Sequence, residues 1–380
     1  MSNAADYAFM ARALRLAERG IYSADPNPRV GCVLVRDGEI VGEGWHCRAG
    51  ESHAEVHALR QAGERARGAD VYVTLEPCCH HGRTPPCSDA LIAAGVARVV
   101  AATADPNPRV AGEGMRQLTR AGITVETGLL QNEAERLNRG FLQRMRGGRP
   151  WVRCKLAMSL DGRTALANGA SQWITGEAAR RDVQYWRARS SAVMTGIGTV
   201  LADDPALTVR SQPPLWAECG CGEEIRQPLR VVLDTSLRMP AQARMLKQPG
   251  RTWIVTAAED QAAAQGLAAA GATVLRAPPA YGESGLNLSA VLQILAKEGI
   301  NELWVEAGAT LSGALVQEGL VDELIIYMAP LLMGDMARGL FHLPSFERLA
   351  ECIALDISEV RAVGHDWRIT AQVRKAQDSM

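Results

Sequence analysis

A histidine, a glutamate and two cysteines in the first quarter of the chain constrain its fold and chemistry more than any other feature. They stand in the run His53-x-Glu55, at Cys78 and at Cys87. One imidazole and two thiolates can hold Zn²⁺ and leave its fourth position free for water. The metal lowers the pKa of that water from about 15.7 to about 7, and Glu55 is close enough to carry a proton from it. These residues therefore predict a hydrolytic zinc centre.

The alternative interpretation is a closed, structural zinc site. Such sites usually have four protein ligands, and Cys79, His80 or His81 could be the fourth. Glu55 favours catalysis, because a closed site needs no proton carrier. The order His-x-Glu, then Pro-Cys and a second Cys, is typical of zinc-dependent deaminases. Eight residues lie between the two cysteines here, instead of the usual Cys-x-x-Cys.

The composition indicates which kinds of partner and which cellular compartment to expect. The chain of 380 residues has a formal net charge of -1, so no basic field attracts nucleic acid, and we expect no such partner. The first residues lack the basic and apolar regions of a signal peptide, and no apolar run is long enough to cross a membrane. The cysteines are clustered rather than spread, which indicates a reducing compartment. We expect a cytoplasmic protein with no membrane partner.

Helix and strand patterns alternate in both halves, which predicts two α/β domains. A basic run with glycine and proline at 144–150 marks a boundary, so we expect domains at 1–147 and 148–380. The first should be a three-layer α/β sandwich. Its expected elements are helices at 6–19, 53–67, 88–94 and 112–121 and strands at 30–35, 40–45, 71–75, 96–101 and 123–126.

The second domain should hold a sheet of mainly buried strands. A segment at 212–227, with Cys219 and Cys221 and no periodicity, is expected to be a loop insertion. The expected elements are strands at 152–157, 192–195, 230–233, 252–255, 273–275, 303–306 and 323–327 and helices at 177–188, 259–270, 288–298 and 310–318.

The expected elements bring the zinc residues to the ends of helices and strands. His53 and Glu55 begin one helix, Cys78 follows a strand, and Cys87 opens the next helix. The positive ends of two helix dipoles beside the sulfurs would favour the thiolates that a metal needs.

One short run occurs twice. Residues 24–30, Ala-Asp-Pro-Asn-Pro-Arg-Val, recur identically as residues 104–110. Two similar turns beside strands would explain this without any function. Alternatively, both copies line the deaminase pocket, with Asn27 supplying an amide for the edge of a pyrimidine.

Two features of the second half suggest ligand contacts. The run 305–314 follows an apolar strand and opens a helix, and Gly308 at its turn would let a phosphate approach the backbone N–H groups. A tight strand–helix turn without a ligand is the simpler explanation. Lys155 lies in a strand of a chain with four lysines among 41 basic residues. It suggests a need for a compact ammonium, unless it is a surface residue.

Both halves together resemble the bifunctional deaminase–reductases of riboflavin biosynthesis, over nearly the whole chain. The runs that carry the resemblance are 27–33 (Asn-Pro-Arg-Val-Gly-Cys-Val), 53–59 (His-Ala-Glu-Val-His-Ala-Leu), 74–87, 159–165 (Ser-Leu-Asp-Gly-Arg-Thr-Ala), 171–175, 201–210 and 304–308. The cysteine spacing, unusual for deaminases in general, belongs to this family. The resemblance implies a cytidine-deaminase-like N-terminal domain and a dihydrofolate-reductase-like C-terminal domain.

The resemblance also implies two consecutive reactions with Zn²⁺ and NADPH as cofactors. The first domain would hydrolyse the 2-amino group of 2,5-diamino-6-ribosylamino-4(3H)-pyrimidinone 5′-phosphate and release ammonia. The second would reduce the ribosyl group to an open-chain ribityl group. A small-molecule pyrimidine ribose phosphate is therefore the expected substrate, and a homo-oligomer, a dimer or larger, is expected through the reductase half.

By the same resemblance, His53, Cys78 and Cys87 bind zinc and Glu55 carries the proton. We further hypothesise that Lys155 and Glu306 polarise or protonate the sugar during hydride transfer. The expected substrate contacts of the second domain are Ser171, Arg187, Leu207, Arg210 and Glu306. The expected cofactor contacts are Ala157, Trp173, Thr199, Asp203, Thr235, Gly308, Ala309, Thr310, Leu311, Ser312, Gly313 and Ala314.

Two rival functions remain at this stage. One is a nucleoside or tRNA deaminase with an unrelated appended domain, which would show a basic surface patch and consume no NADPH. The other is a zinc-stabilised binding module without catalysis, in which Glu55 would have no role in ammonia release.

Overall fold

The computed structural model describes residues 3–80, 85–214, 216–218, 225–281 and 285–374. The chain forms two compact units. The first holds residues 1–149 and a short segment that contains Trp216, and the second holds residues 150–213 and 225–380. None of the helices in these described ranges is long and apolar enough to span a membrane.

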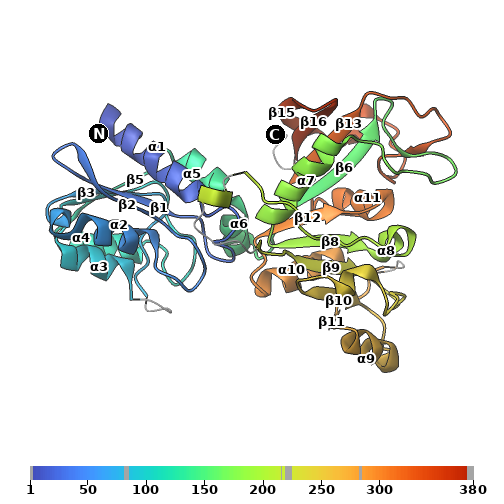
Figure 1. Cartoon of the computed structure of the whole chain (residues 1–380), viewed down its shortest axis with the longest axis horizontal. Helices are drawn as coiled ribbons and strands as arrows, with labels where there is room; N and C mark the ends of the chain where they lie inside the picture. Colours follow the sequence, from blue (N-terminus) through green and yellow to red (C-terminus); the bar gives the residue numbers. More distant parts are fainter. Residues whose placement is uncertain (1–2, 81–84, 215, 219–224, 282–284, 375–380) are drawn as a thin grey trace. The chain divides into compact units, whose positions relative to one another are not determined.

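The first unit, in the blue to blue-green part of the chain in Figure 1, is built on a five-stranded sheet. Its strand order is β2-β1-β3-β4-β5. Strand β1 pairs antiparallel with β2 and β3, whereas β3, β4 and β5 run parallel. Asp37 and Gly38 form the β1–β2 turn with positive φ angles, as an Asp-Gly hairpin requires. The strands are β1 Gly31–Arg36, β2 Glu39–Trp45, β3 Asp70–Val73, β4 Arg98–Ala101 and β5 Thr124–Thr127.

Helices cover both faces of this sheet, which confirms the three-layer sandwich. One face buries Ala54, Leu91 and Leu118 from α2, α3 and α4, and the other buries Met10 and Ala134 from α1 and α5. The helices are α1 Ala4–Glu18, α2 Ala54–Ala62, α3 Cys87–Ala94, α4 Glu113–Arg120, α5 Gln131–Leu137 and α6 Arg139–Gly147.

The second unit has a nine-stranded sheet with the order β11-β10-β9-β8-β12-β6-β13-β16-β15. All neighbours from β11 to β13 are parallel, and β13, β16 and β15 pair antiparallel. The strands are β6 Trp151–Ser159, β8 Ala192–Gly196, β9 Leu229–Leu233, β10 Thr252–Thr256, β11 Ala272–Arg276, β12 Glu302–Glu306, β13 Glu323–Ala329, β15 Leu355–Val363 and β16 Asp366–Val373. A separate two-stranded pair is formed by β7 Arg163–Ala165 and β14 Arg338–Gly339.

This sheet also lies between two helical layers. Val291 of α10 and Leu315 of α11 join the core on one face. Val183 of α7, Val200 of α8 and Leu267 of α9 join the core on the other. The helices are α7 Glu177–Arg189, α8 Ile197–Asp203, α9 Gln261–Ala269, α10 Leu288–Lys297 and α11 Ala309–Gln317.

The strands β15 and β16 and the helix α8 were not predicted from the sequence. In β15 the pairing shifts between Ile357 and Glu359, so a bulge at Ser358 breaks the alternation by which a strand is recognised. Helix α8 is only seven residues long and has a glycine in its first turn, so its sequence looks like a polar turn. Cys219 and Cys221, in the predicted insertion, lie outside the described residues, as does His81.

Candidate active sites

The structure brings His53, Cys78 and Cys87 together at one end of the first sheet. The Cys78 and Cys87 sulfurs lie 3.6 and 3.3 Å from the His53 Nδ1 atom. All three ligand atoms lie within 4.8 Å of one another. Zinc bonds of about 2.0–2.3 Å in a tetrahedron give ligand separations of this size. One imidazole and two thiols at these distances therefore fit a zinc ion that keeps a fourth position open.

Two glycines in β2 allow helix α2 to carry His53 to this place. A Cβ atom on Gly42 would lie 2.2 Å from the Ala58 carbonyl oxygen, and one on Gly44 would lie 2.3 Å from that of Ala54. Any side chain at either position would push α2 off the strand. Close packing of the helix on β2 fixes its first residue, Ala54, and with it the preceding His53.

The electrostatics of this cluster suit a metal and a proton carrier. The hydrogen bond between the two sulfurs is the main cause that lowers the pKa of Cys78 and the main cause that raises the pKa of Cys87. Glu55, in the first turn of α2, is 3% exposed. Burial is the main reason that its pKa is raised, and the charge of Cys78 adds to it. A carboxylate in this setting can hold a proton and release it.

Asn27 is connected to the zinc residues through a histidine that the sequence analysis missed. Its Nδ2 atom lies 3.0 Å from the Nε2 atom of His46, and the His46 ring lies edge-on to the His53 ring with 5.2 Å between centroids. His46 follows β2 outside any motif, so its sequence position gave no signal. The predicted amide thus lies beside the predicted metal ligands.

The second copy of the repeated run contributes a buried acid to the same region. Asp105 is 7% exposed. Burial chiefly raises its pKa, to about 6, with further contributions from the charges of Glu76 and Cys78. Asp105 belongs to the copy that was predicted to line the pocket, although nothing in the sequence distinguished this residue from its neighbours.

In the second unit, Lys155 and Glu306 are register partners on the adjacent strands β6 and β12. Arg187 of α7 forms a bidentate ion pair with Glu306. Its Nε and Nη2 atoms donate to the two carboxylate oxygens at 2.5 and 2.9 Å. Trp304 Nε1 donates a third hydrogen bond to Glu306 at 2.9 Å. The structure therefore assembles a cluster of two cations and one carboxylate from three separate segments.

The neighbouring charges and burial shift the pKa values of both Glu306 and Lys155. Burial disfavours the charged form of Glu306, but the charge and hydrogen bonds of Arg187 outweigh it and lower the pKa to about 2. Burial also lowers the pKa of Lys155, against the attraction of Glu306. In the described part of the chain, the Lys155 ammonium makes no hydrogen bond, so its protons are available to a ligand.

The neighbouring strands β8 and β12 form a topological switch point. The chain leaves β8 for β9 on one side, and it leaves β12 for β13 on the other. In open α/β sheets, ligands bind beyond the carboxyl ends of strands at such a point. A Cβ atom on Gly196, at the end of β8, would lie 3.5 Å from Leu311 Cδ2, so the two turns are adjacent.

These two turns fit the phosphates of a dinucleotide. Gly196 and Gly308 precede α8 and α11 and provide no side-chain cap, so the first N–H groups remain open to a ligand. A Cβ atom on Gly308 would meet nothing within 4 Å, which leaves space beside the backbone. The hydroxyl of Thr195 is buried and has no hydrogen-bond partner among the described residues. Such an orphaned polar atom next to the turn also suits a bound ligand.

Within the predicted cofactor run 308–314, the residues divide into two groups. Gly308 and Thr310 are exposed at the helix start, whereas Ser312 and Gly313 are buried. A Cβ atom on Gly313 would lie 2.1 Å from the His342 carbonyl oxygen, so close packing of that segment explains this glycine.

Hydrogen bonds connect two segments that contain further predicted residues to Asp203, at the end of α8, and to Arg187. Gln172, between the predicted Ser171 and Trp173, donates to Asp203 at 3.1 Å, and Trp173 is 71% exposed with the Arg180 guanidinium over its ring. The carbonyl of Thr208, next to the predicted Leu207, accepts from Arg187 at 3.0 Å. Leu207 itself is buried and Arg210 is exposed; Ala157 and Thr199 are half-buried.

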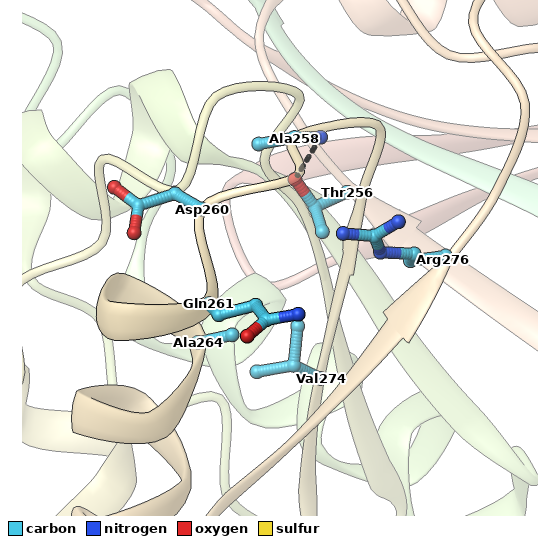
Figure 2. Close-up of a pocket in the computed structure, with 7 residues that line it drawn as sticks. All are labelled: Thr256, Ala258, Asp260, Gln261, Ala264, Val274 and Arg276. Carbon is cyan, nitrogen blue, oxygen red and sulfur yellow. Dashed lines mark hydrogen bonds between the residues drawn. The ribbon is translucent and has the colours of Figure 1, made fainter.

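A separate hollow of about 350 Å³ lies where β10 and β11 end beside α9 (Figure 2). Figure 2 shows Arg276 and Gln261 on its wall, together with Thr256, whose hydroxyl donates to the carbonyl of the predicted Thr235 at 3.0 Å. Thr235 does not line the hollow itself and is connected to it through Thr256.

Comparison with known proteins identifies both units. Residues 3–103 match the model of the cytidine and deoxycytidylate deaminase zinc-binding region, and residues 150–369 match that of the RibD C-terminal domain. The chain is 55% identical over 368 residues to the riboflavin biosynthesis protein RibD of Escherichia coli, covering 95% of this chain and 97% of the relative. The chain belongs to the RibD family. The RibD protein of Haemophilus influenzae is 48% identical, with 96% of each chain covered.

Solved structures agree with this assignment. Acinetobacter baumannii RibD matches with a TM-score of 0.89 and 48% identity, covering 98% of this chain and 99% of that one. A deaminase/reductase from Thermotoga maritima, described as a diaminohydroxyphosphoribosylaminopyrimidine deaminase and 5-amino-6-(5-phosphoribosylamino)uracil reductase, matches with a TM-score of 0.83, 31% identity and coverage of 97% and 99%. The first unit is thus cytidine-deaminase-like, the second is a RibD reductase domain with a dihydrofolate-reductase-like fold, and Zn²⁺ and NADPH are the cofactors.

Proposed function

We propose that this RibD protein deaminates 2,5-diamino-6-ribosylamino-4(3H)-pyrimidinone 5′-phosphate and then reduces the ribosyl group of the product to a ribityl group. The observation that supports it best is the coexistence, in one chain, of the His53, Cys78 and Cys87 cluster with the Lys155 and Glu306 cluster. We assign the first reaction to residues 1–147 and the second to residues 148–380. A nucleoside or tRNA deaminase is not favoured, because RibD relatives match over nearly the whole chain.

In the deaminase site, His53, Cys78 and Cys87 hold the zinc. Zinc, when bound, supplies a Lewis acid that makes water a nucleophile at neutral pH. Glu55 takes the proton that the attacking water loses and delivers it to the departing 2-amino group, which leaves as ammonia. Asn27, held by His46, meets the edge of the pyrimidine.

In the reductase site, the turns at Gly196 and Gly308 would hold the phosphates of NADPH, which would supply a hydride to the C1′ atom of the sugar. Addition of the hydride breaks the C1′–O4′ bond and opens the ribose ring, and Lys155 donates the proton that O4′ then takes up. Hydrogen bonds from Arg187 and Trp304 orient Glu306, and the negative charge of Glu306 attracts the Lys155 ammonium. Arg210, whose side chain is exposed, meets the ribose phosphate. Ser171 and Leu207 complete the proposed substrate contacts. The cofactor contacts are Ala157, Trp173, Thr199, Asp203, Thr235 and the run 308–314.

The test of the proposal follows both reactions on one sample. Purified protein receives the diaminopyrimidine phosphate and NADPH, and ammonia release and NADPH oxidation are measured together. We expect ammonia to appear first and NADPH to be oxidised in equal amount. Release of ammonia without oxidation of NADPH would contradict the second half of the proposal, and no release would contradict the first.

We also propose a cytoplasmic, homo-oligomeric enzyme with no nucleic acid partner. The β15–β16 hairpin supports the oligomer. Its apolar side chains Leu355, Ile357, Val360 and Trp367 are between 40% and 63% exposed. Register places them on one sheet face, because Ile357 pairs with Ala371 and Val360 with Ile369. An exposed apolar patch at a sheet edge is typical of a protein interface.

The hairpin gives a direct prediction about assembly. A carboxylate from Ile357→Glu would be buried unpaired between two copies. We therefore expect the variant to sediment as a single chain of 40.9 kDa, and the wild type as a dimer or larger. Asp356→Asn, which changes the adjacent residue that pairs with Arg374, serves as the matched control and should keep the wild-type mass. An unchanged mass for Ile357→Glu would exclude this face as the interface.

A further inference from the structure

Glu76 has an environment that the reaction described above does not explain. Its side chain is 4% exposed, and in the described ranges of the chain it has no cationic partner. Instead it accepts three backbone hydrogen bonds: Oε2 from the N–H groups of Asp105 and Gly112 at 3.1 and 3.0 Å, and Oε1 from Met115 at 3.4 Å. A buried carboxylate is costly unless such donors satisfy it, so these contacts tie residues 105–115 firmly to Glu76.

The same carboxylate caps helix α4. The N-cap residue of α4 is Gly112, which has no side chain to bond the first N–H groups. Glu76 bonds the N–H groups of Gly112 and Met115 from another segment and places a negative charge at the positive end of the helix dipole. Just before the helix, Ala111 and Gly112 have φ angles of +36° and +84°. The Glu76 bond holds this unfavourable turn at Ala111.

The segment 105–115, which Glu76 holds, lies directly against the loop that contains Cys78. A Cβ atom on Gly114 would lie 2.0 Å from the Pro77 carbonyl oxygen. Ser88 bonds the Cys78 carbonyl at 3.1 Å and Gln117 of α4 at 2.8 Å. Glu76 thus stands at the junction between the loop that supplies a zinc ligand and the segment that contains the second copy of the repeated run.

We propose that Glu76 is a positioning residue for the deaminase pocket. Its carboxylate fixes residues 104–112 against the Cys78 loop, so that this copy of the repeated run presents its polar side chains to the pyrimidine. The inference rests on the proposed deaminase function. It gives a role to a residue that contacts neither the metal nor the substrate. It predicts that loss of the Glu76 carboxylate raises KM for ammonia release much more than it lowers kcat.

The variant Glu76→Gln tests this role. The amide keeps the size of the side chain but loses the charge and places an NH₂ group against at least one N–H donor. We expect the KM for the diaminopyrimidine phosphate, measured by ammonia release, to rise about tenfold, since a hydrogen bond to a charged group is lost. The kcat should stay within about twofold, and the zinc content should remain that of the wild type.

Two further variants make the test decisive. Glu113→Gln is the matched control, because Glu113 is an acid in the first turn of the same helix that pairs only with Arg116 and Arg120 on the surface of the described chain. It should leave KM unchanged. Gly114→Ala keeps the Glu76 carboxylate but crowds both Pro77 and Glu76 Oε1, since its Cβ atom would lie 2.0 Å from the Pro77 carbonyl oxygen and 3.3 Å from Glu76 Oε1, and it should raise KM in the same way. NADPH oxidation with the deaminated substrate shows that the reductase unit of each variant is folded, and the far-UV circular dichroism and thermal unfolding of each variant report on the deaminase unit.

Several results would overturn the inference. An unchanged KM in both Glu76→Gln and Gly114→Ala would exclude it. Loss of zinc, with kcat falling and KM constant, would make Glu76 a support of the metal site and would equally exclude a role in substrate positioning. Failure of the proposed deaminase function looks different, because the wild type itself would then release no ammonia.

Discussion

Replacing Glu55 by glutamine should lower ammonia release by about a thousandfold or more, which is the range for loss of a general acid–base group. Glutamine has the size of glutamate but cannot take up and release a proton. Glu55 is 3% exposed at the start of α2, so water has little room to replace its carboxylate. The measurement is the kcat for ammonia release from the diaminopyrimidine phosphate, with the zinc content of each preparation determined alongside.

The control for this prediction stands on the same stretch of chain. Glu64→Gln changes an exposed carboxylate in the turn after α2 and should leave ammonia release as in the wild type. Both variants should bind zinc, since neither residue belongs to the His53, Cys78 and Cys87 group. Both should reduce the deaminated substrate with NADPH normally. Wild-type ammonia release by a zinc-loaded Glu55→Gln protein would show that another group carries the proton.

The deaminase site was largely predictable because its chemistry is local in sequence. His53 and Glu55 are two residues apart, and helix and strand patterns place both cysteines at the ends of elements. His46 and Glu76 were not predictable, since each acts through a partner distant in the chain. His46 contacts Asn27 from the end of a different strand. Glu76 bonds N–H groups 29 to 39 residues further along the chain.

The reductase site was harder to predict, because its residues are far apart in the sequence. The scarcity of lysine indicated Lys155, and the resemblance indicated Arg187 and Glu306, but only the strand order brings the three residues together. About 150 residues separate Lys155 from Glu306 in the sequence, but parallel pairing makes their strands β6 and β12 neighbours. Hydrophobic periodicity predicts that each strand exists but does not predict which strands pair. Arg187 was expected to contact the substrate, and this stays a prediction. The structure adds that its guanidinium bonds both carboxylate oxygens of Glu306 and so helps to position that side chain.

Replacing Lys155 by methionine should lower NADPH oxidation about a hundredfold with the deaminated substrate, because the sugar loses its proton donor. Methionine fills similar space without the charge. The Kd of NADPH, measured by fluorescence, should change little, since the open N–H groups lie in the turns at Gly196 and Gly308. Lys247→Met is the matched control: it removes one of the few other lysines, exposed at the surface, and should leave the rate unchanged.

The pH profile distinguishes a proton donor from a structural lysine. Burial lowers the pKa of Lys155 below the usual value of about 10.4. A donor must be protonated, so the wild-type rate should fall as pH rises through this lowered pKa, and the residual rate of Lys155→Met should lack that alkaline limb. Glu306→Gln removes the charge that favours the ammonium and should move the limb to lower pH. An alkaline limb that persists unchanged in Lys155→Met would assign the proton to another group.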